Sequence, residues 1–282
     1  MIRAMKNETL LGEPDGFEMP ERGSYTEDKY ALIRLYCDLF SNGMRYKWKG
    51  KRVYVDLYAG SGLCRIEGTR RVLLGSPLIA LSVEARFDRY IFCENDPNCM
   101  TALKERVKRM HPEQDVHWID GDCNEQIEHL CDLIPEDDLV LCFVDPDDCG
   151  LHHETLKRLS RSARGVDFLC LLAFQMDTKR AIAHYQSPEN RKLDLMLGNS
   201  DWRDRWTQEQ VTGTDLARFL AIEFAGSMER LGYRPTELAD MRVIKRKHVP
   251  LYYLALFSKH PTAFKYWDQV LKYATPQRGL FD

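Results

Sequence analysis

Apolar and polar positions follow two rhythms along the first part of the chain. Short, mostly apolar stretches predict strands over residues 52–60, 89–95, 115–122, 138–146 and 166–174. The stretches between them place apolar residues three and four positions apart, which predicts helices over residues 76–85, 97–110, 124–134 and 153–163. The same spacing predicts a helix ahead of the first strand, over residues 25–46. Thr26 and Ser76 are predicted to open the first two helices.

Strands that alternate with helices of about ten residues predict β-α-β units and a parallel sheet. The stretch 138–146 is almost continuously apolar, as burial on both faces of a sheet requires. We therefore predict an α/β fold with a Rossmann-like, doubly wound, mostly parallel sheet.

The pattern changes after residue 174. Residues 177–232 are rich in charge and predict a helical insert, with Trp202 and Trp206 on one apolar face. Residues 242–260 predict two strands around a basic turn, and such a pair would close the sheet in antiparallel fashion. A final helix is predicted over residues 262–274.

The length of 282 residues fits one large domain, predicted over residues 25–282 behind a polar lead-in over 1–24. A net charge of -3 excludes a global basic field, although it leaves room for a local basic patch. The 9 cysteines include no C-x-x-C pair, which is typical of reduced thiols and proposes no metal site. We see no signal peptide and no apolar run near the ~20 residues that span a bilayer, so a cytoplasmic protein without a membrane partner is predicted.

Four successive strands end in acidic residues. The carboxyl ends of parallel strands meet at one edge of the sheet, where ligands bind. One acid at a strand end is often only a helix cap, and Asp122 and Asp148 have that alternative. Four in a row, with glycines after the first, favour a nucleoside site. The residues concerned are Asp56 with Gly60 and Gly62, then Glu94, then Asp122, then Asp145 with Pro146.

The kind of nucleoside follows from what the glycine-rich loop contains. It has no G-K-[ST] sequence, so it lacks the lysine of a phosphate-binding P-loop. Arg65 stands where a dinucleotide-binding fingerprint would have its third glycine. A nucleoside without phosphates, in surroundings rich in carboxylates, suits the cationic S-adenosylmethionine.

The motifs "VYVDLYAGSG", "IFCENDP", "IDGDCN" and "FVDPDDCG" resemble motifs I to IV of the class I S-adenosylmethionine-dependent methyltransferases. The match extends further. "YTEDKYALIRLYCDLF", "GSPLIAL", "FCENDPNC" and "LYYLALFSKHPTAFKYWDQVLKYATPQRGLFD" resemble the three-Cys-motif partner proteins, TcmP, over about residues 25–282. That resemblance implies a methyltransferase-like fold more firmly than it implies a reaction, and it implies a three-Cys-motif protein as partner.

The resemblance also implies roles for individual residues. It assigns Asp56, Tyr58, Gly60 and Gly62 to the methionine end of the cofactor, Glu94 to the ribose, and Asp122 with Cys123 to the adenine. It assigns Asp145 and Pro146, with Asp148 in the same loop, to the acceptor and the catalytic step. Amino-group methyltransferases have a D/N-P-P-Y/F loop there, whereas this chain has "DPDD" and lacks the second proline and the aromatic residue.

Two basic regions are candidates for substrate contacts. Residues 63–75 delay the helix that usually follows the glycine loop, and they predict either a lid, a substrate contact or a plain surface loop. Solvated charge is the more common role of such basic residues. The candidates for a phosphate-contacting rim are Arg70, Arg71, Lys245, Arg246 and Lys247.

Three functions are compatible with these patterns. The first is a methyltransferase that acts on a nucleic acid. The second is a non-catalytic protein that keeps the cofactor and serves as partner or specificity subunit of another enzyme. The third, less favoured, is a metal-dependent nuclease that uses Asp145, Asp147 and Asp148, since clustered carboxylates suit Mg²⁺.

Overall fold

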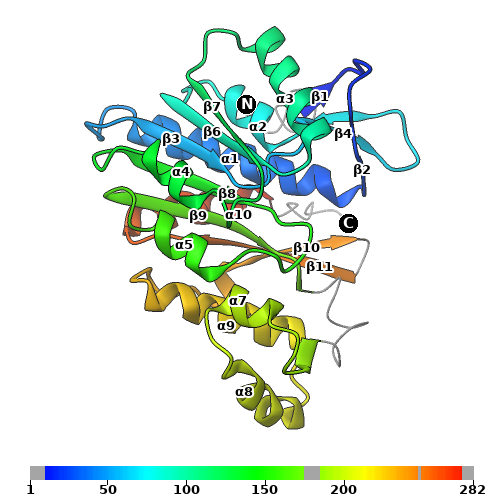
Figure 1. The fold of residues 1–282 in the computed structure, drawn as a ribbon, viewed down its shortest axis with the longest axis vertical. Coiled ribbons are helices and arrows are strands. Elements are labelled where there is room, and N and C mark those ends of the chain that lie inside the picture. The colour runs from blue at the N-terminus through cyan, green and yellow to red at the C-terminus, as the bar shows by residue number, and fades with distance from the viewer. Residues whose placement is uncertain (1–9, 175–184, 247–248, 275–282) are drawn as a thin grey trace, which may run out of the picture.

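The computed structural model describes residues 10–174, 185–246 and 249–274. Its centre is a seven-stranded sheet with the strand order β10-β11-β9-β8-β3-β6-β7 (Figure 1). The five strands from β9 to β7 are parallel to one another. Their bounds are Arg52–Asp56 (β3), Arg89–Glu94 (β6), Val116–Asp120 (β7), Leu139–Val144 (β8) and Gly165–Leu172 (β9).

The last two strands, β10 (Arg242–Arg246) and β11 (Val249–Phe257), form the predicted antiparallel pair. β11 also pairs with β9 in antiparallel fashion, so β10 runs parallel to the main strands and β11 against them. Numbered along the chain within this sheet, the order is 6-7-5-4-1-2-3, which is the arrangement of class I methyltransferases. The predicted fold class is therefore confirmed.

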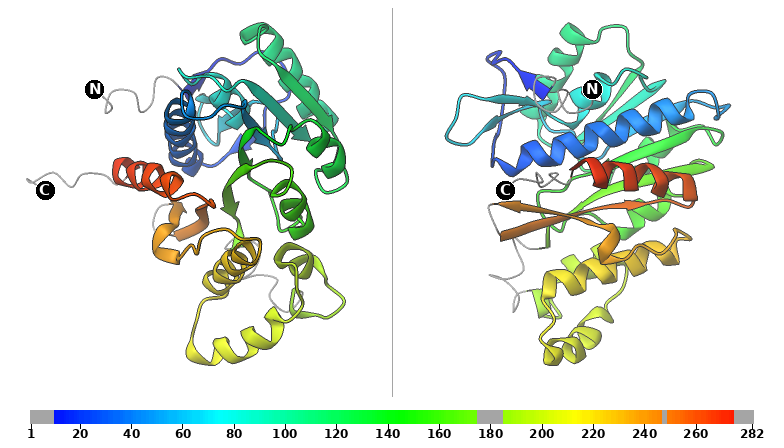
Figure 2. Two further views of the ribbon diagram at one scale, coloured as in Figure 1. Left: turned by 90° about the vertical axis from the view of Figure 1, so that its left-hand side faces the viewer. Right: turned by 180° about the vertical axis from the view of Figure 1, so that it is seen from behind.

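Helices cover both faces of the sheet. α1 (Tyr25–Met44), α2 (Ser76–Leu81), α3 (Pro97–Met110) and α10 (Pro261–Ala274) pack on one face, and Figure 2 shows α1 and α10 side by side there. The opposite face is covered by α4 (Ile127–Asp132), α5 (His153–Leu159) and α9 (Leu216–Arg230). Because the central strands are buried on both faces, their almost continuous apolar sequence is explained.

Some predicted helix bounds are wrong. α1 begins at Tyr25 with Ser24 in the capping position, so Thr26 lies inside the helix. Gly75 occupies the capping position of α2 and Ser76 is its first residue. α2 ends at Leu81 rather than at residue 85, and the Ser82 hydroxyl at its end donates to the Leu78 carbonyl 2.6 Å away. α4 and α5 are also shorter than their periodicity suggested.

The segment 63–75 is a β-hairpin and not a loop. β4 (Leu63–Ile66) and β5 (Val72–Leu74) pair with each other, and the lead-in adds β1 (Leu11–Gly12) and β2 (Glu21–Arg22) to make a second, four-stranded sheet. The apolar side chains of this hairpin are buried. The hairpin is thus a fixed part of the fold.

The insert is helical where it is described. α7 (Lys192–Leu197), α8 (Trp202–Glu209) and α9 gather at one end of the molecule, on the side of β10 and β11 (Figure 1). Trp202 and Trp206 are buried in the core, and Trp206 packs on Phe219. The prediction that both tryptophans form an apolar face is confirmed. Across the described ranges, every helix is too short or too polar to cross a bilayer.

Candidate cofactor and acceptor site

A cavity of about 520 Å³ opens at the carboxyl ends of the parallel strands. This volume lies in the range of about 300–1,000 Å³ that is common for small-molecule sites. Its wall includes Gly60 after β3, Glu94 at the end of β6, Asp122 after β7 and Asp145 after β8. The four strand ends singled out in the sequence thus meet at one cavity.

Gly60 and Gly62 have different structural reasons to be glycine. Both have positive φ angles, of 63° and 83° respectively. A Cβ at Gly62 would lie 2.7 Å from the Leu103 side chain, so Gly62 is required for the contact between the loop and α3. A Cβ at Gly60 would meet nothing within 4 Å, and Gly60 lines the cavity. A side chain at Gly60 would therefore project into open space beside the cavity wall.

Asp56 lies beneath the cavity and does not line its wall. Its Oδ1 accepts from the Tyr58 backbone N–H at 3.2 Å, and its Oδ2 accepts from the Tyr54 hydroxyl at 3.3 Å. Complete burial raises the pKa of Asp56 to about 7, against the opposing effect of a hydrogen bond from Ser76. Asp56 therefore holds the turn after β3 and titrates near neutral pH.

Glu94 joins the glycine loop to the end of β6. Its Oε2 accepts from the Gly60 N–H and its Oε1 from the Asp96 N–H, both at 2.7 Å. Each carboxylate oxygen has two lone pairs, so each keeps one for a further donor. The two backbone contacts orient the carboxylate, which can then accept from two vicinal hydroxyls.

The next part of the cavity wall contains Asp122 and Cys123, which follow β7, and Tyr58, which follows β3. Asp122 Oδ1 accepts from the Asn124 N–H at 2.7 Å, so this carboxylate also caps a turn. Burial raises the pKa of the Cys123 thiol to about 11, against the opposing effect of the neighbouring Tyr58 hydroxyl. The thiol is therefore neutral at physiological pH and serves as an apolar wall.

Asp145 forms an ion pair that the sequence did not suggest. Lys29 Nζ, from α1, lies 2.6 Å from Asp145 Oδ2, and the two side chains are only 9% and 17% exposed. Lys29, Asp145 and the adjacent Pro146 all line the cavity. The ammonium neutralises the carboxylate and fixes its orientation at the cavity wall.

The other two aspartates of this loop are paired as well. Arg22 of β2 lies 3.1 Å from Asp147, and Lys192 of α7 lies 2.6 Å from Asp148. Asp148 also accepts from the Gly150 N–H at 2.7 Å. The loop after β8 is therefore tied to the N-terminal segment and to the helical insert by cations from separate elements.

Two tyrosines stand close to this loop. Tyr25 of α1 and Tyr252 of β11 line the cavity together with Asp145 and Pro146. Their rings lie 5.4 Å apart between centroids, and their hydroxyls are 3.1 Å apart. The loop after β8 has no aromatic residue of its own, but Tyr25 and Tyr252 provide aromatic surface beside it from two other elements.

Arg106 of α3 anchors the glycine loop from outside the cavity. Its side chain is 1% exposed and donates to both carboxylate oxygens of Asp15, from Nε at 2.8 Å and from Nη2 at 2.7 Å. The same guanidinium donates to the carbonyl of Ser61, between the two glycines, at 2.6 Å, and to the carbonyl of Glu18 at 2.8 Å. One cation thus holds the N-terminal segment against the glycine loop.

The predicted basic rim does not lie at the cavity wall as far as the structure describes it. Arg71 pairs with Glu27 at 2.6 Å, and Arg70 is exposed at the turn of the hairpin. Neither these two nor Lys245 lines the cavity. Arg246 is the last residue of β10, and Lys247 lies outside the described residues.

The residues of the cavity wall are compatible with a cationic nucleoside such as S-adenosylmethionine. Gly60 leaves open space for a ligand to approach the backbone, and Glu94 is held with spare acceptors for a ribose. Glu94, Asp96 and Asp122 give the wall three acids that no described ion pair neutralises. A cationic cofactor suits such a wall. Among the described residues, no group of three or more His, Cys, Asp or Glu could hold a metal ion.

Six residues at or beside the site were not predicted from the sequence: Arg22, Tyr25, Lys29, Arg106, Lys192 and Tyr252. A signal existed for Lys29, since it stands three, four and seven positions before Leu32, Ile33 and Tyr36 on the buried stripe of α1. A lysine on an apolar stripe has to find a buried partner. The other cations lie in segments where charge is common, so nothing distinguishes them.

Comparisons with solved structures return distant relatives. The O-methyltransferase from Bacillus cereus, in complex with SAH, is 11% identical over 83% of this chain and 81% of its own, with a TM-score of 0.46. TYW2 of M. jannaschii, in complex with AdoMet, is 12% identical over 79% and 74%, with a TM-score of 0.36. A Legionella pneumophila protein is 11% identical over 87% and 92%, with a TM-score of 0.48.

No family model matches the sequence, and no curated protein matches it. The strand order and strand directions of this chain are those of the class I methyltransferase fold.

Proposed function

We propose that the protein is an S-adenosylmethionine-dependent methyltransferase whose acceptor belongs to a nucleic acid. One observation carries the proposal: Glu94 is fixed by the Gly60 and Asp96 amides at the rim of a cavity that Gly60 leaves open. A carboxylate with this orientation and spare lone pairs is suited to a ribose. The remaining acids of the wall suit the positive charge of the cofactor.

When bound, S-adenosylmethionine supplies an electrophilic methyl group. The chain's own contribution is to position the acceptor, since proximity alone can provide ~7–11 kcal/mol of the barrier. Lys29 holds Asp145 Oδ2, and among the described residues no donor contacts Asp145 Oδ1. That oxygen is available to accept a hydrogen from the acceptor group.

The tyrosines beside Asp145 support a planar acceptor. Tyr25 and Tyr252 present aromatic surface from α1 and β11 to the same cavity. Aromatic side chains stack on bases of any sequence, with about 1–3 kcal/mol for each base. A base removed from its stack is therefore the acceptor that we favour.

Transfer of a tritiated methyl group to RNA and DNA from cells that lack the gene tests the proposal. We expect label with the wild type and with Asp147→Asn, a control in the same loop. Asp145→Asn should lower the rate by about 10²-fold or more, as for a group that handles the acceptor proton. Equal label with Asp145→Asn would overturn the role of Asp145, and no label with the wild type would overturn the reaction.

A non-catalytic role is the second candidate, and the Lys29–Asp145 ion pair favours it. An engaged carboxylate accepts less strongly from an incoming acceptor than a free one, so this pair would suit a binding protein. Binding of S-adenosylmethionine without any labelled acceptor, in the presence of a three-Cys-motif protein, would favour this role. Such a result would also support the resemblance to TcmP.

Two features of the loop after β8 bear on the nuclease hypothesis, one in favour and one against. Lys29 lies beside Asp145, as a nuclease site would have it, but each of the three aspartates is already paired with a cation. Paired carboxylates are poor ligands for Mg²⁺ because the neighbouring cation competes for the same oxygens. Cleavage that depends on Mg²⁺ alone would revive this hypothesis.

A further inference from the structure

A second cavity, of about 500 Å³, lies at the amino ends of the parallel strands, opposite the first cavity. We call the two ends of the strands the carboxyl edge and the amino edge of the sheet. The turn that leads into β3 has the sequence "RYKWKGKR" over residues 45–52. The residues that line the cavity are Arg45, Trp48, Lys49, Gly50, Lys51 and Arg52 of this stretch, together with Asp88 and Asp138. We call residues 45–51 the basic turn. A strand of five or six residues is about 17–20 Å long, so this turn is remote from the cofactor cavity.

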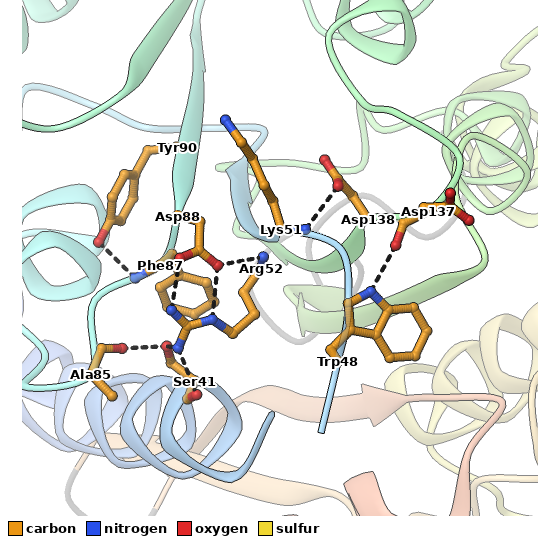
Figure 3. A network of polar contacts seen from close by, with 10 residues as sticks. All are labelled: Ser41, Trp48, Lys51, Arg52, Ala85, Phe87, Asp88, Tyr90, Asp137 and Asp138. Carbon is orange, nitrogen blue, oxygen red and sulfur yellow. Dashed lines mark hydrogen bonds and ion pairs between the residues drawn. The ribbon is translucent and has the colours of Figure 1, made fainter. Parts of the chain in front are cut away.

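The basic turn is held firmly by its neighbours. Trp48 Nε1 donates to the Asp137 carbonyl at 2.8 Å, and the Lys51 N–H donates to Asp138 Oδ1 at 3.0 Å, as Figure 3 shows. A Cβ at Gly50 would lie 2.1 Å from the Asp137 carbonyl oxygen, so only glycine permits this approach. Because the turn is fixed in advance, a ligand would not have to order it.

Arg52 also lines this second cavity, but its guanidinium is not available to a ligand. Its guanidinium bonds both oxygens of Asp88 at 2.9 Å and the Ser41 carbonyl at 2.9 Å. Figure 3 shows this fork between α1 and the start of β6. The arginine thus serves the fold, and the charges open to a ligand come from the turn itself.

Three cations of the turn are exposed and unpaired. Among the described residues, Arg45, Lys47 and Lys49 make no ion pair, and all three are exposed. Lys51, in contrast, pairs with Asp115 at 3.2 Å. In a chain with a net charge of -3, three unpaired cations within five residues make a local positive surface.

An exposed aromatic ring accompanies these cations. Tyr46 is 87% exposed and stands next to the Arg45 guanidinium, which lies 5.4 Å from its ring centroid. The surface of the basic turn therefore offers cations beside a ring on which a base can stack.

We propose that the basic turn binds single-stranded nucleic acid. Phosphates would contact Arg45, Lys47 and Lys49, and a base would stack on Tyr46. Phosphate alone does not use the ring, and a membrane headgroup does not stack. This inference does not depend on the proposed methyl transfer, since the surface lies at the other edge of the sheet.

Fluorescence anisotropy of a labelled single-stranded RNA, titrated with the full chain, tests the proposal. Wild type should bind with a slope of log K against log salt near about -2, since each phosphate contact contributes about -0.7. The double variant Lys47→Glu/Lys49→Glu should reduce that slope to roughly one third and weaken binding at least tenfold. Tyr46→Ala should weaken binding about tenfold with the slope unchanged.

The control has the same change in net charge at other exposed lysines, Lys108→Glu/Lys265→Glu, and should bind as the wild type does. Circular dichroism would confirm that all variants are folded. The proposal is overturned if the control weakens binding as much as Lys47→Glu/Lys49→Glu, or if neither double variant weakens it. Binding to phosphatidylserine vesicles that equals binding to RNA would also overturn it.

Discussion

The two edges of the sheet carry cavities of nearly equal volume, about 520 and 500 Å³, with opposite chemistry. At the carboxyl edge, acids at the strand ends surround glycines, and the cations present are paired with aspartates. At the amino edge, the turn before β3 presents cations that have no partner among the described residues. One edge thus suits a cationic cofactor and the other an anionic polymer.

This difference has a structural cause. Each parallel strand leaves the carboxyl edge through a loop to a helix, so four strand ends can each deliver an acid to one place. At the amino edge, the chain enters β3 from α1 through a single turn, and that turn supplies three of the four cations that line the cavity, Arg45, Lys49 and Lys51. The acids of the carboxyl edge thus come from separate segments, whereas the cations of the amino edge come from one.

The largest loss of stability is expected for a substitution of Arg106, which joins separate segments at the carboxyl edge. Arg106→Ala leaves the Asp15 carboxylate and the Ser61 and Glu18 carbonyls without their donor. Removal of one partner from a buried pair should lower the free energy of unfolding by about 3 kcal/mol. Urea denaturation measures this change, with the exposed neighbour Lys108→Ala as control. A loss below about 1 kcal/mol would contradict the anchoring role.

Glu94→Gln should weaken ligand binding at the carboxyl edge and leave binding at the amino edge unchanged. The amide NH₂ would face either the Gly60 or the Asp96 N–H, so one donor would meet another. We expect affinity for S-adenosylmethionine to fall by about 10–100-fold, since hydrogen bonds to charged groups contribute about 1.5–3 kcal/mol. Equilibrium dialysis measures this affinity, and Glu125→Gln, an exposed residue outside the cavity wall, is the control for the same chemical change. RNA binding at the basic turn should remain unchanged in the same variant.

Buried carboxyls should make stability depend on pH. Burial raises the pKa of Asp56 and of Asp167 from 3.8 to about 7, and a hydrogen bond from Ser258 opposes the effect at Asp167. The folded state binds these protons more tightly than the unfolded chain does. Their stabilising effect is therefore full below about pH 4 and is lost as pH rises to about 7, at up to 1.4 kcal/mol per pH unit for each group.

Asp56→Asn and Asp167→Asn should each flatten this pH dependence, as urea denaturation at several pH values would reveal. Only Asp56 lies beneath the cofactor cavity, because Asp167 is in β9 beside Ser258. Affinity for S-adenosylmethionine should therefore rise with pH through 7 in the wild type and in Asp167→Asn, and not in Asp56→Asn. The same pH profile in both variants would contradict the assignment of Asp56 to the cofactor site.

The smallest effect is expected at the amino edge. Tyr46 is 87% exposed, so Tyr46→Ala should change the free energy of unfolding by less than about 0.5 kcal/mol. Thermal denaturation measures this directly. A larger loss would mean that the Tyr46 ring stabilises the fold. The ring would then have a structural role, which would contradict its assignment to nucleic-acid binding.

Much of the fold could be predicted because buried side chains recur at regular intervals along the sequence. The parallel strands are apolar on both faces and the helices between them are amphipathic, so their order and type were visible. The hairpin over 63–75 was missed because its strands are short and pair with β1 and β2 of the lead-in. Pairing between distant segments leaves no local pattern in either of them.

The site was predictable to the extent that it consists of strand ends. Asp56 and Glu94 end their strands, and Asp122 and Asp145 come just after theirs, so the parallel topology brings all four to one end of the sheet. Lys29 and Tyr252 reach the cavity from α1 and β11, and only the packed structure joins them to Asp145. At the basic turn, the sequence displays its charges but does not reveal that Arg52 is buried and Tyr46 exposed.

Calorimetric titration with S-adenosylmethionine tests the central claim most directly. Gly60→Leu and Gly68→Leu are a matched pair, since both glycines have positive φ angles, 63° and 71°, and a Cβ at either meets nothing within 4 Å. Only Gly60 lines the cavity. The account predicts one binding site in the wild type and in Gly68→Leu, and binding weakened at least tenfold in Gly60→Leu. No binding by the wild type, or equal binding by both variants, would contradict it.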